Sequence, residues 1–336
     1  MRTTLRLLAF CLSCSVLSAV AAQVEGLHEV REPVASQEAG ERSAAMARAL
    51  QSLVVRLTGD RRSAADPRLQ PLLADPQQLV QQFVYEPGEP VTLAVVFDPV
   101  LTERALREAG LSLWHVNRPQ VLAWWLEEET AGNRLLAEDQ PAAEALRQAA
   151  RQRGVPLGLP LGDLQEQLLA TPQVLAGSQI QALREASEGY AADALLTVLA
   201  RPGEADWQLW LGEERQSGSV RGASREALAD GVLLEVAERL AARFAAGAGA
   251  QSLTLEVQGS DLARFASLER LLEPFGAQLR EVQGDRLVYR LQGTPAQVRA
   301  QLQLGRLHEL PADAPAAAGQ PLQVPAASGE RLRFAW

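Results

Sequence analysis

Few side chains in this sequence have the types and spacing that enzyme chemistry needs. Its three histidines, His28, His115 and His308, are far apart, and none is followed by the second histidine of a zinc-binding helix. There is no lysine, which excludes a phosphate-loop lysine, a Schiff base and a lysine general base. A Gly-x-Ser-x-Gly elbow, the signature of esterases, is also missing. The sequence therefore predicts no catalytic residue, no metal site and no cofactor.

Carboxylates are the remaining groups that could act as acid and base. Glu127, Glu128 and Glu129 follow one another at the end of an expected strand. A glycosidase holds two acids about 5–10 Å apart on different elements, whereas a charge run at a strand end is more typical of a solvated loop. We expect a loop here, and a hydrolase with paired carboxylates is the third functional alternative.

The tryptophans are a more suggestive feature, because most of them fall in the middle of the chain. Trp124 and Trp125 lie on one apolar run and should point to opposite faces of a strand. Trp207 shares its face with Leu209 and should be core, whereas Trp210 lies on the other face. An uncovered face would make Trp210 an aromatic surface patch typical of a binding site. A sheet covered on both sides is the alternative.

Arg118 is a candidate for holding a ligand. Its guanidinium could clamp a carboxylate or phosphate, and a site near Trp114, Arg118 and Asp163 would suit a small molecule or glycan. An arginine before a proline is equally typical of the entry to a helix or strand. Together, the binding candidates are Trp114, Arg118, Trp124, Asp163, Tyr190 and Trp210.

The first residues predict export. Arg2 and Arg6 precede an apolar run that ends in small residues at Ala22, the layout of a secretory signal peptide. Both cysteines, Cys11 and Cys14, lie inside it, so the mature chain would be cysteine-free. Removing the signal leaves 30 basic against 41 acidic residues, a net charge of about −11. That charge disfavours nucleic acid and anionic lipid as partners, and no later run is long enough to span a membrane.

The pattern of apolar residues predicts a multi-domain α/β (mixed α+β) protein. Helices are expected at 40–58, 76–83, 101–109, 141–153, 178–190 and 225–244, and strands at 91–97, 121–126, 193–199, 207–211 and 217–221. The run 91–97 should be covered on both faces, and 155–161 should be an edge strand or an extended loop because of its two prolines.

The last part of the chain predicts a small β-α-β-β-α module. An alternating strand at 253–257, a helix capped by Ser260-Asp261, a hairpin turned by Gly284-Asp285 and a helix begun by Thr294-Pro295 follow in that order. The expected divisions are 1–22 signal peptide, 23–112 N-terminal α+β module, 113–245 central α/β domain, 251–306 β-α-β-β-α module and 307–336 Ala/Pro-rich tail with a terminal strand. Whether that strand pairs within its own chain or with a partner is left open.

Several short segments of the sequence, taken together, resemble one family. They are Arg48-Ala49-Leu50 continuing to Val54–Gly59, Trp114 with Arg118–Leu122, Arg153–Leu157 with Leu159-Pro160-Leu161-x-Asp163, and Ala186-Ser187 with Tyr190 before Asp193. In order and spacing they resemble domain of unknown function 2066, an uncharacterised family of exported proteobacterial proteins. Glu188-Gly189 departs from the family pattern, in which an arginine precedes the tyrosine. The resemblance implies an exported protein and no established activity.

The sequence favours a non-enzymatic accessory or scaffold protein in the periplasm of a Gram-negative bacterium, acting by contacts with an envelope protein. The missing catalytic constellation, the modular layout and the aromatic strands support this interpretation. A periplasmic protein that binds a small molecule or glycan is the alternative.

Overall fold

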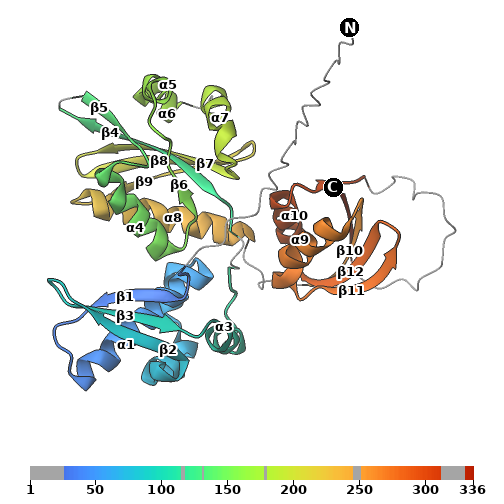
Figure 1. The fold of residues 1–336 in the computed structure, drawn as a ribbon, viewed down its shortest axis with the longest axis horizontal. Coiled ribbons are helices and arrows are strands. Elements are labelled where there is room, and N and C mark those ends of the chain that lie inside the picture. The colour runs from blue at the N-terminus through green and yellow to red at the C-terminus, as the bar shows by residue number, and fades with distance from the viewer. Residues whose placement is uncertain (1–25, 115–117, 131, 178–179, 245–250, 312–329) are drawn as a thin grey trace, which may run out of the picture.

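The computed structural model describes residues 26–114, 118–130, 132–177, 180–244, 251–311 and 330–336. Three modules follow one another along the chain, each with its own sheet (Figure 1). This confirms the expected mixed α+β, multi-domain fold. The expected signal peptide, His115, the linker 245–250 and the Ala/Pro-rich stretch after Pro311 lie outside the described residues. Within those residues, no helix has both the length and the apolar character that crossing a bilayer requires.

The N-terminal module packs helices against a three-stranded antiparallel sheet of order β1-β3-β2. Its elements are β1 (Glu29–Pro33), α1 (Ala39–Thr58), α2 (Gln70–Ala74), β2 (Val80–Glu86), β3 (Thr92–Phe97) and α3 (Pro99–Glu108). The stripe on α1 that begins at Met46 and ends at Leu57 is buried against the sheet. Gly59 then ends the helix in the left-handed conformation, as its sequence position predicts.

Two expectations for this module are wrong. The expected helix 76–83 is a single 3-10 turn, Pro76–Leu79, followed directly by β2. The β-branched and aromatic residues from Val80 onward pair with β3 instead of continuing a helix. β3 was expected to be covered on both faces, but only the face of Leu93, Val95 and Phe97 is fully buried. The other face carries the half-buried Val96 and the ion pairs of Arg31 with Glu29 and Glu86.

The central domain is a layered α/β unit around a sheet of order β5-β4-β7-β8-β9, with the short β6 parallel to β4. Its strands are β4 (Val121–Glu129), β5 (Gly132–Leu136), β6 (Leu157–Gly158), β7 (Ala194–Arg201), β8 (Glu204–Leu211) and β9 (Glu214–Arg221). Its helices are α4 (Glu144–Arg153), α5 (Leu164–Leu169), α6 (Pro172–Ala176), α7 (Gln181–Ser187) and α8 (Arg225–Phe244). The expected meander β7-β8-β9 and the bounds of α8 are confirmed.

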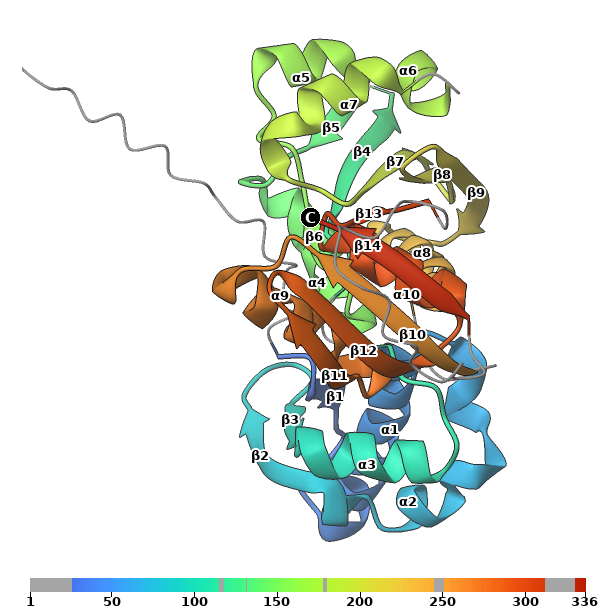
Figure 2. The ribbon, with the colours of Figure 1, turned by 90° about the vertical axis from the view of Figure 1, so that its right-hand side faces the viewer.

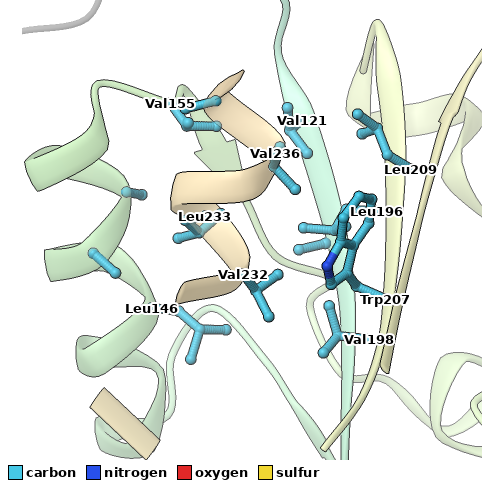
Figure 3. Close-up of a cluster of buried hydrophobic side chains, with 14 of the residues drawn as sticks. Val121, Leu146, Val155, Leu196, Val198, Trp207, Leu209, Val232, Leu233 and Val236 are labelled. Carbon is cyan, nitrogen blue, oxygen red and sulfur yellow. The ribbon is translucent and has the colours of Figure 1, made fainter. Parts of the chain in front are cut away.

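Helices cover both faces of this sheet. Figure 3 shows the face on which Val121, Leu196 and Trp207 meet Val232 and Val236 of α8. The opposite face packs against α6 and α7. The expected helix 178–190 is shorter, because a 3-10 turn at Glu188–Tyr190 follows α7, and α5 and α6 were not expected.

The C-terminal module has the expected β-α-β-β-α order and a terminal strand that completes its sheet. It contains β10 (Gln251–Gln258), α9 (Leu262–Leu272), β11 (Gln278–Gln283), β12 (Arg286–Gly293), α10 (Pro295–Leu304), β13 (His308–Glu309) and β14 (Arg331–Ala335). The sheet order is β11-β12-β10-β14-β13. β14 lies beside β10 (Figure 2) and pairs with it in parallel. Leu332 and Phe334 of β14 are buried in the core of the module. The terminal strand therefore pairs within its own chain.

Candidate functional site

Arg118 and Trp114 lie together, but neither is accessible to a ligand. The Arg118 guanidinium lies 4.1 Å from the centre of the Trp114 ring, and the two residues are 0% and 2% exposed. Arg118 donates to the carbonyl oxygens of Gly154 at 2.6 Å, Arg56 at 2.9 Å and Trp114 at 3.2 Å. The expected ligand clamp is therefore a buried group that holds the backbone of three segments.

A second buried arginine, Arg56, lies beside Arg118. It donates to the carbonyl oxygens of Gln152 at 3.0 Å, Leu27 at 2.9 Å and Glu29 at 2.6 Å. Burial, and then the nearby charge of Arg153, lower the pKa of Arg56 to about 10. Burial, and then the charge of Arg56, lower the pKa of Arg118 to about 9. Several of the accepting carbonyls end α1 and α4, where the helix dipole favours a cation.

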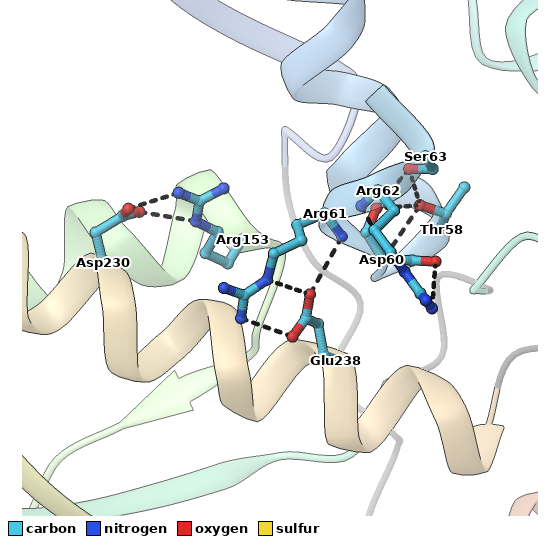
Figure 4. A network of polar contacts seen from close by, with 8 residues as sticks. All are labelled: Thr58, Asp60, Arg61, Arg62, Ser63, Arg153, Asp230 and Glu238. Carbon is cyan, nitrogen blue, oxygen red and sulfur yellow. Dashed lines mark hydrogen bonds and ion pairs between the residues drawn. The ribbon is translucent and has the colours of Figure 1, made fainter. Parts of the chain in front are cut away.

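Contacts on either side of these arginines join the N-terminal module to the central domain. The turn after α1 is held by hydrogen bonds of Thr58 with Ser63 and of Asp60 with Arg62 (Figure 4). It presents Arg61 to Glu238 of α8 in a two-pronged ion pair of 2.6 and 2.7 Å. We call Arg56, Gly59, Arg61, Trp114 and Arg118 the module joint. Figure 4 also shows Arg153 paired with Asp230 along the same side of α8.

Asp163 and Tyr190 meet elsewhere, through Glu166. Asp163 is exposed and accepts from the Glu166 backbone as the N-cap of α5, and Glu166 completes the capping box. The Tyr190 hydroxyl donates to the buried Glu166 carboxylate and accepts from the Leu161 N–H at 2.8 Å. Burial, and then the hydrogen bond to Glu166, raise the pKa of Tyr190. The structure therefore brings Asp163 and Tyr190 together, in a network that holds the start of α5.

Trp124 and Trp210 belong to the core between the sheet and α6 and α7. Trp124 is 0% exposed and donates to the Ser187 hydroxyl at 3.1 Å. Trp210 is 8% exposed, and the guanidinium groups of Arg184 and Arg215 lie over its ring. Of the two alternatives for Trp210, the covered sheet is the one that the structure shows, so no aromatic surface patch forms there. The six candidates thus separate into Trp114 with Arg118, and the other four on the opposite face of the sheet.

The run Glu127–Glu129 is also corrected, because it belongs to β4 rather than to a loop. Glu127 is 8% exposed and accepts from Arg225 at 2.5 and 2.9 Å and from Arg134 at 2.7 Å. Burial acts to raise the pKa of Glu127, but the hydrogen bonds from Arg225 and Arg134 outweigh it and lower the pKa. Glu127 is therefore an ionised group at the centre of an ion-pair network.

We expect Glu127→Gln to be less stable at pH 7 by about 2 kcal/mol, because two guanidinium groups lose their carboxylate. A lowered carboxyl pKa contributes stability above its ordinary value and loses it as the pH falls through the lowered value. The deficit of the variant should therefore shrink between about pH 5 and pH 3. Urea unfolding across this range measures it, with the exposed Glu188→Gln as control. A deficit that stays constant with pH would contradict the assignment.

Sequence reasoning missed an exposed apolar surface at α5. Leu161, Leu164 and Leu168 are 71%, 72% and 71% exposed, although each is large and apolar. Leu164 and Leu168 are four residues apart on α5 and so lie on one side of the helix, and Leu161 lies just before its N-cap Asp163. Leu161 ends the stretch 155–161, for which an edge strand or an extended loop was expected, and no element was expected at Leu164 and Leu168. We call these three residues the leucine surface.

Carboxylates surround the leucine surface. The exposed Asp163 lies next to Leu164, and Glu138 donates its N–H to the Pro160 carbonyl at 3.0 Å. Glu188 lies in the turn whose Tyr190 bonds to Leu161. Both glutamates are exposed. The leucine surface thus has an acidic rim.

A groove of about 470 Å³ lies between α8, β9 and α10. Its lining residues are Glu214, Gln216, Arg239, Ala242, Arg243, Ala296, Arg299, Ala300 and Gln303. Arg243 is paired with Glu214, and Arg299 with Glu309 at 2.9 Å. Two of its three arginines are therefore already neutralised.

Comparison with known proteins adds a family match for the first module. A family model described as a domain of unknown function, DUF8605, matches residues 21–115. The match ends one residue after Trp114, so it includes every residue of the module joint except Arg118. None of the curated proteins matches the chain. The match agrees with the expectation of an uncharacterised family but does not carry the number 2066.

Proposed function

We propose that this chain is an exported, non-catalytic accessory protein of the bacterial envelope that binds a partner protein through the leucine surface. The observation that carries this proposal is the exposure of Leu161, Leu164 and Leu168, each above 70%. Export rests on the signal-like pattern of residues 1–22 and on the resemblance to domain of unknown function 2066. The buried state of Trp114 and Arg118 favours this function over ligand binding at those residues.

The leucine surface favours a particular kind of partner. Covering each leucine would contribute roughly 1–2 kcal/mol from apolar burial. The acidic rim of Glu138, Asp163 and Glu188 favours basic side chains around the apolar contact. We therefore propose an apolar partner segment flanked by arginine or lysine. Self-association through this surface is disfavoured, because it would bring two acidic rims together.

A photocrosslinking residue in place of Leu164, used in living cells, should trap one partner in the envelope. The trapped protein is identified, purified and titrated against the full mature chain by calorimetry. The triple variant Leu161→Gln, Leu164→Gln and Leu168→Gln should weaken binding at least about 100-fold, because the apolar contact is lost. Glutamine preserves helix propensity in α5.

The matched control replaces Val100, Leu101 and Leu262 with glutamine. These are 75%, 48% and 85% exposed and lie on other modules, so a similar apolar area is removed elsewhere. The control should bind like the unchanged chain. Equal weakening in both triple variants, or a crosslink only to a second copy of the chain, would refute the proposal.

A further inference from the structure

The sheet of the C-terminal module has one covered and one open face. α9 and α10 pack on the face of Leu255, Tyr289 and Phe334, which are 0% exposed. In Figures 1 and 2 these helices lie on the side of the sheet toward the central domain, and α10 contacts α8. Because side chains alternate along a strand, the intervening residues of β10, β12 and β14 face outward.

Arginines dominate the open face. Arg286 and Arg290 lie on β12, and Arg331 and Arg333 lie on β14, with β10 between them. Thr254 of β10 pairs with Arg290 on one side and with Arg331 on the other. Arg290 and Arg331 are therefore about 10 Å apart across two strand spacings. This concentration of positive charge occurs in a chain whose formal net charge is −9.

The face already holds carboxylates that pair with its arginines, and one of them, Glu281 of β11, lies 3.8 Å from Arg286. Glu256, 4% exposed, lies on β10 at the centre of the four arginines. It accepts from Arg286 at 2.9 and 3.4 Å, and Arg333 lies at 3.8 Å. The geometry is the fork by which a guanidinium recognises a carboxylate.

Arg290 and Arg331 carry no such partner. Both are exposed, and the side chain of neither has a hydrogen bond or an ion pair with another residue in the described part of the chain. They flank Thr254 of β10, which lies two residues before Glu256 on the same strand. The guanidinium groups of Arg290 and Arg331 are thus available to bind carboxylates, next to the place where Arg286 already binds Glu256.

We infer that this open face binds an acidic, extended segment of a partner protein, with Arg290 and Arg331 contacting its carboxylates. The inference stands apart from the leucine surface, which lies on the central domain. Alternate side chains of an extended peptide are about 6.6 Å apart, and the long, flexible side chains of arginine and glutamate can span the difference from the separation of about 10 Å between Arg290 and Arg331. An acidic segment can therefore place a carboxylate at each of these two arginines.

The outward side chains argue for a peptide over other anions. Those of β10, β12 and β14 include no aromatic ring on which a nucleic-acid base could stack. Val288 is the large apolar residue among them and is 9% exposed, so little apolar surface is available to enter a lipid layer. Carboxylates on a flexible chain remain the best match.

The test uses the full mature chain and a fluorescein-labelled peptide of four Glu-Thr repeats, with a Gln-Thr peptide of equal length as reference. Fluorescence anisotropy should show binding of the acidic peptide alone, weakening as salt increases. Arg290→Glu with Arg331→Glu should weaken binding at least about 10-fold. Arg221→Glu with Arg239→Glu makes the same change in net charge on the central domain and should leave the affinity within about twofold.

A second pair, Arg290→Gln with Arg331→Gln, tests the face if charge reversal prevents folding, and circular dichroism checks each variant. Equal loss of affinity in the face and control variants would overturn the inference. So would tighter, Arg290-dependent binding of a single-stranded oligonucleotide or of phosphatidylglycerol vesicles, because it would assign the face to another class of partner.

Discussion

Arg118→Met is expected to lower the free energy of unfolding by about 3–5 kcal/mol. Methionine has similar length and fills apolar space, so the loss comes from the hydrogen bonds. The carbonyl groups of Gly154, Arg56 and Trp114 would each lose a charged donor in a buried place. Since these groups belong to both modules, the variant should also loosen the N-terminal module from the central domain.

Urea unfolding followed by tryptophan fluorescence measures this effect, because Trp114 lies under the guanidinium. The unchanged chain should show one transition for the two modules, and Arg118→Met an earlier transition. Arg118→Lys keeps a charge but loses the planar fork and should fall between them. Arg221→Met, at an exposed position, is the control. An Arg118→Met curve that overlays the control would contradict the role of the joint.

The parts of the fold that the sequence predicted are those specified by neighbouring residues. The bounds of α8 followed from a regular stripe of apolar residues such as Leu228 and Val232, all buried. The hairpin β11-β12 and the capped start of α10 at Thr294 followed from short turn and capping signals. Such signals involve only a few neighbouring residues, so they can be recognised without knowledge of the tertiary structure.

The parts that were missed depend on contacts between distant segments. Arginine is usually a surface residue. Arg118 and Arg56 are buried because the end of α1 meets the end of α4. Trp210 could be a surface residue or a core residue, depending on whether its face of the sheet is covered. α7 and the unexpected α6 cover that face. The leucine surface is the reverse case, since three large apolar residues, a type that is usually buried, are exposed.

The carbonyl acceptors around Arg118 and Arg56 explain how two arginines can be buried at the module joint. Taking a charge out of water is unfavourable by several kcal/mol unless hydrogen bonds replace its hydration. Arg118 and Arg56 each receive at least three carbonyl acceptors. The lowered pKa of each reports the remaining penalty of burial. The joint therefore depends on keeping α1 and α4 close enough to supply those carbonyls.

Gly59 sets how closely α1 approaches α8, and Gly59→Ala is expected to destabilise the chain by about 3 kcal/mol. Its φ of +66° is unfavourable for an alanine. A Cβ there would lie 2.2 Å from Cβ of Ala241 on α8 and 3.3 Å from the Trp114 ring. Since neither neighbour is the end of a flexible side chain, α1 would have to move away from α8.

The double variant Gly59→Ala with Ala241→Gly separates the two causes. Removing Cβ of Ala241 relieves the overlap but leaves the backbone strain, so roughly 1–2 kcal/mol of the loss should remain. Ala241→Gly alone supplies the cost of a glycine in α8, and the four unfolding free energies form a double-mutant cycle. Additive effects would show that α1 and α8 do not meet at Gly59, and the module joint would lose its closest contact.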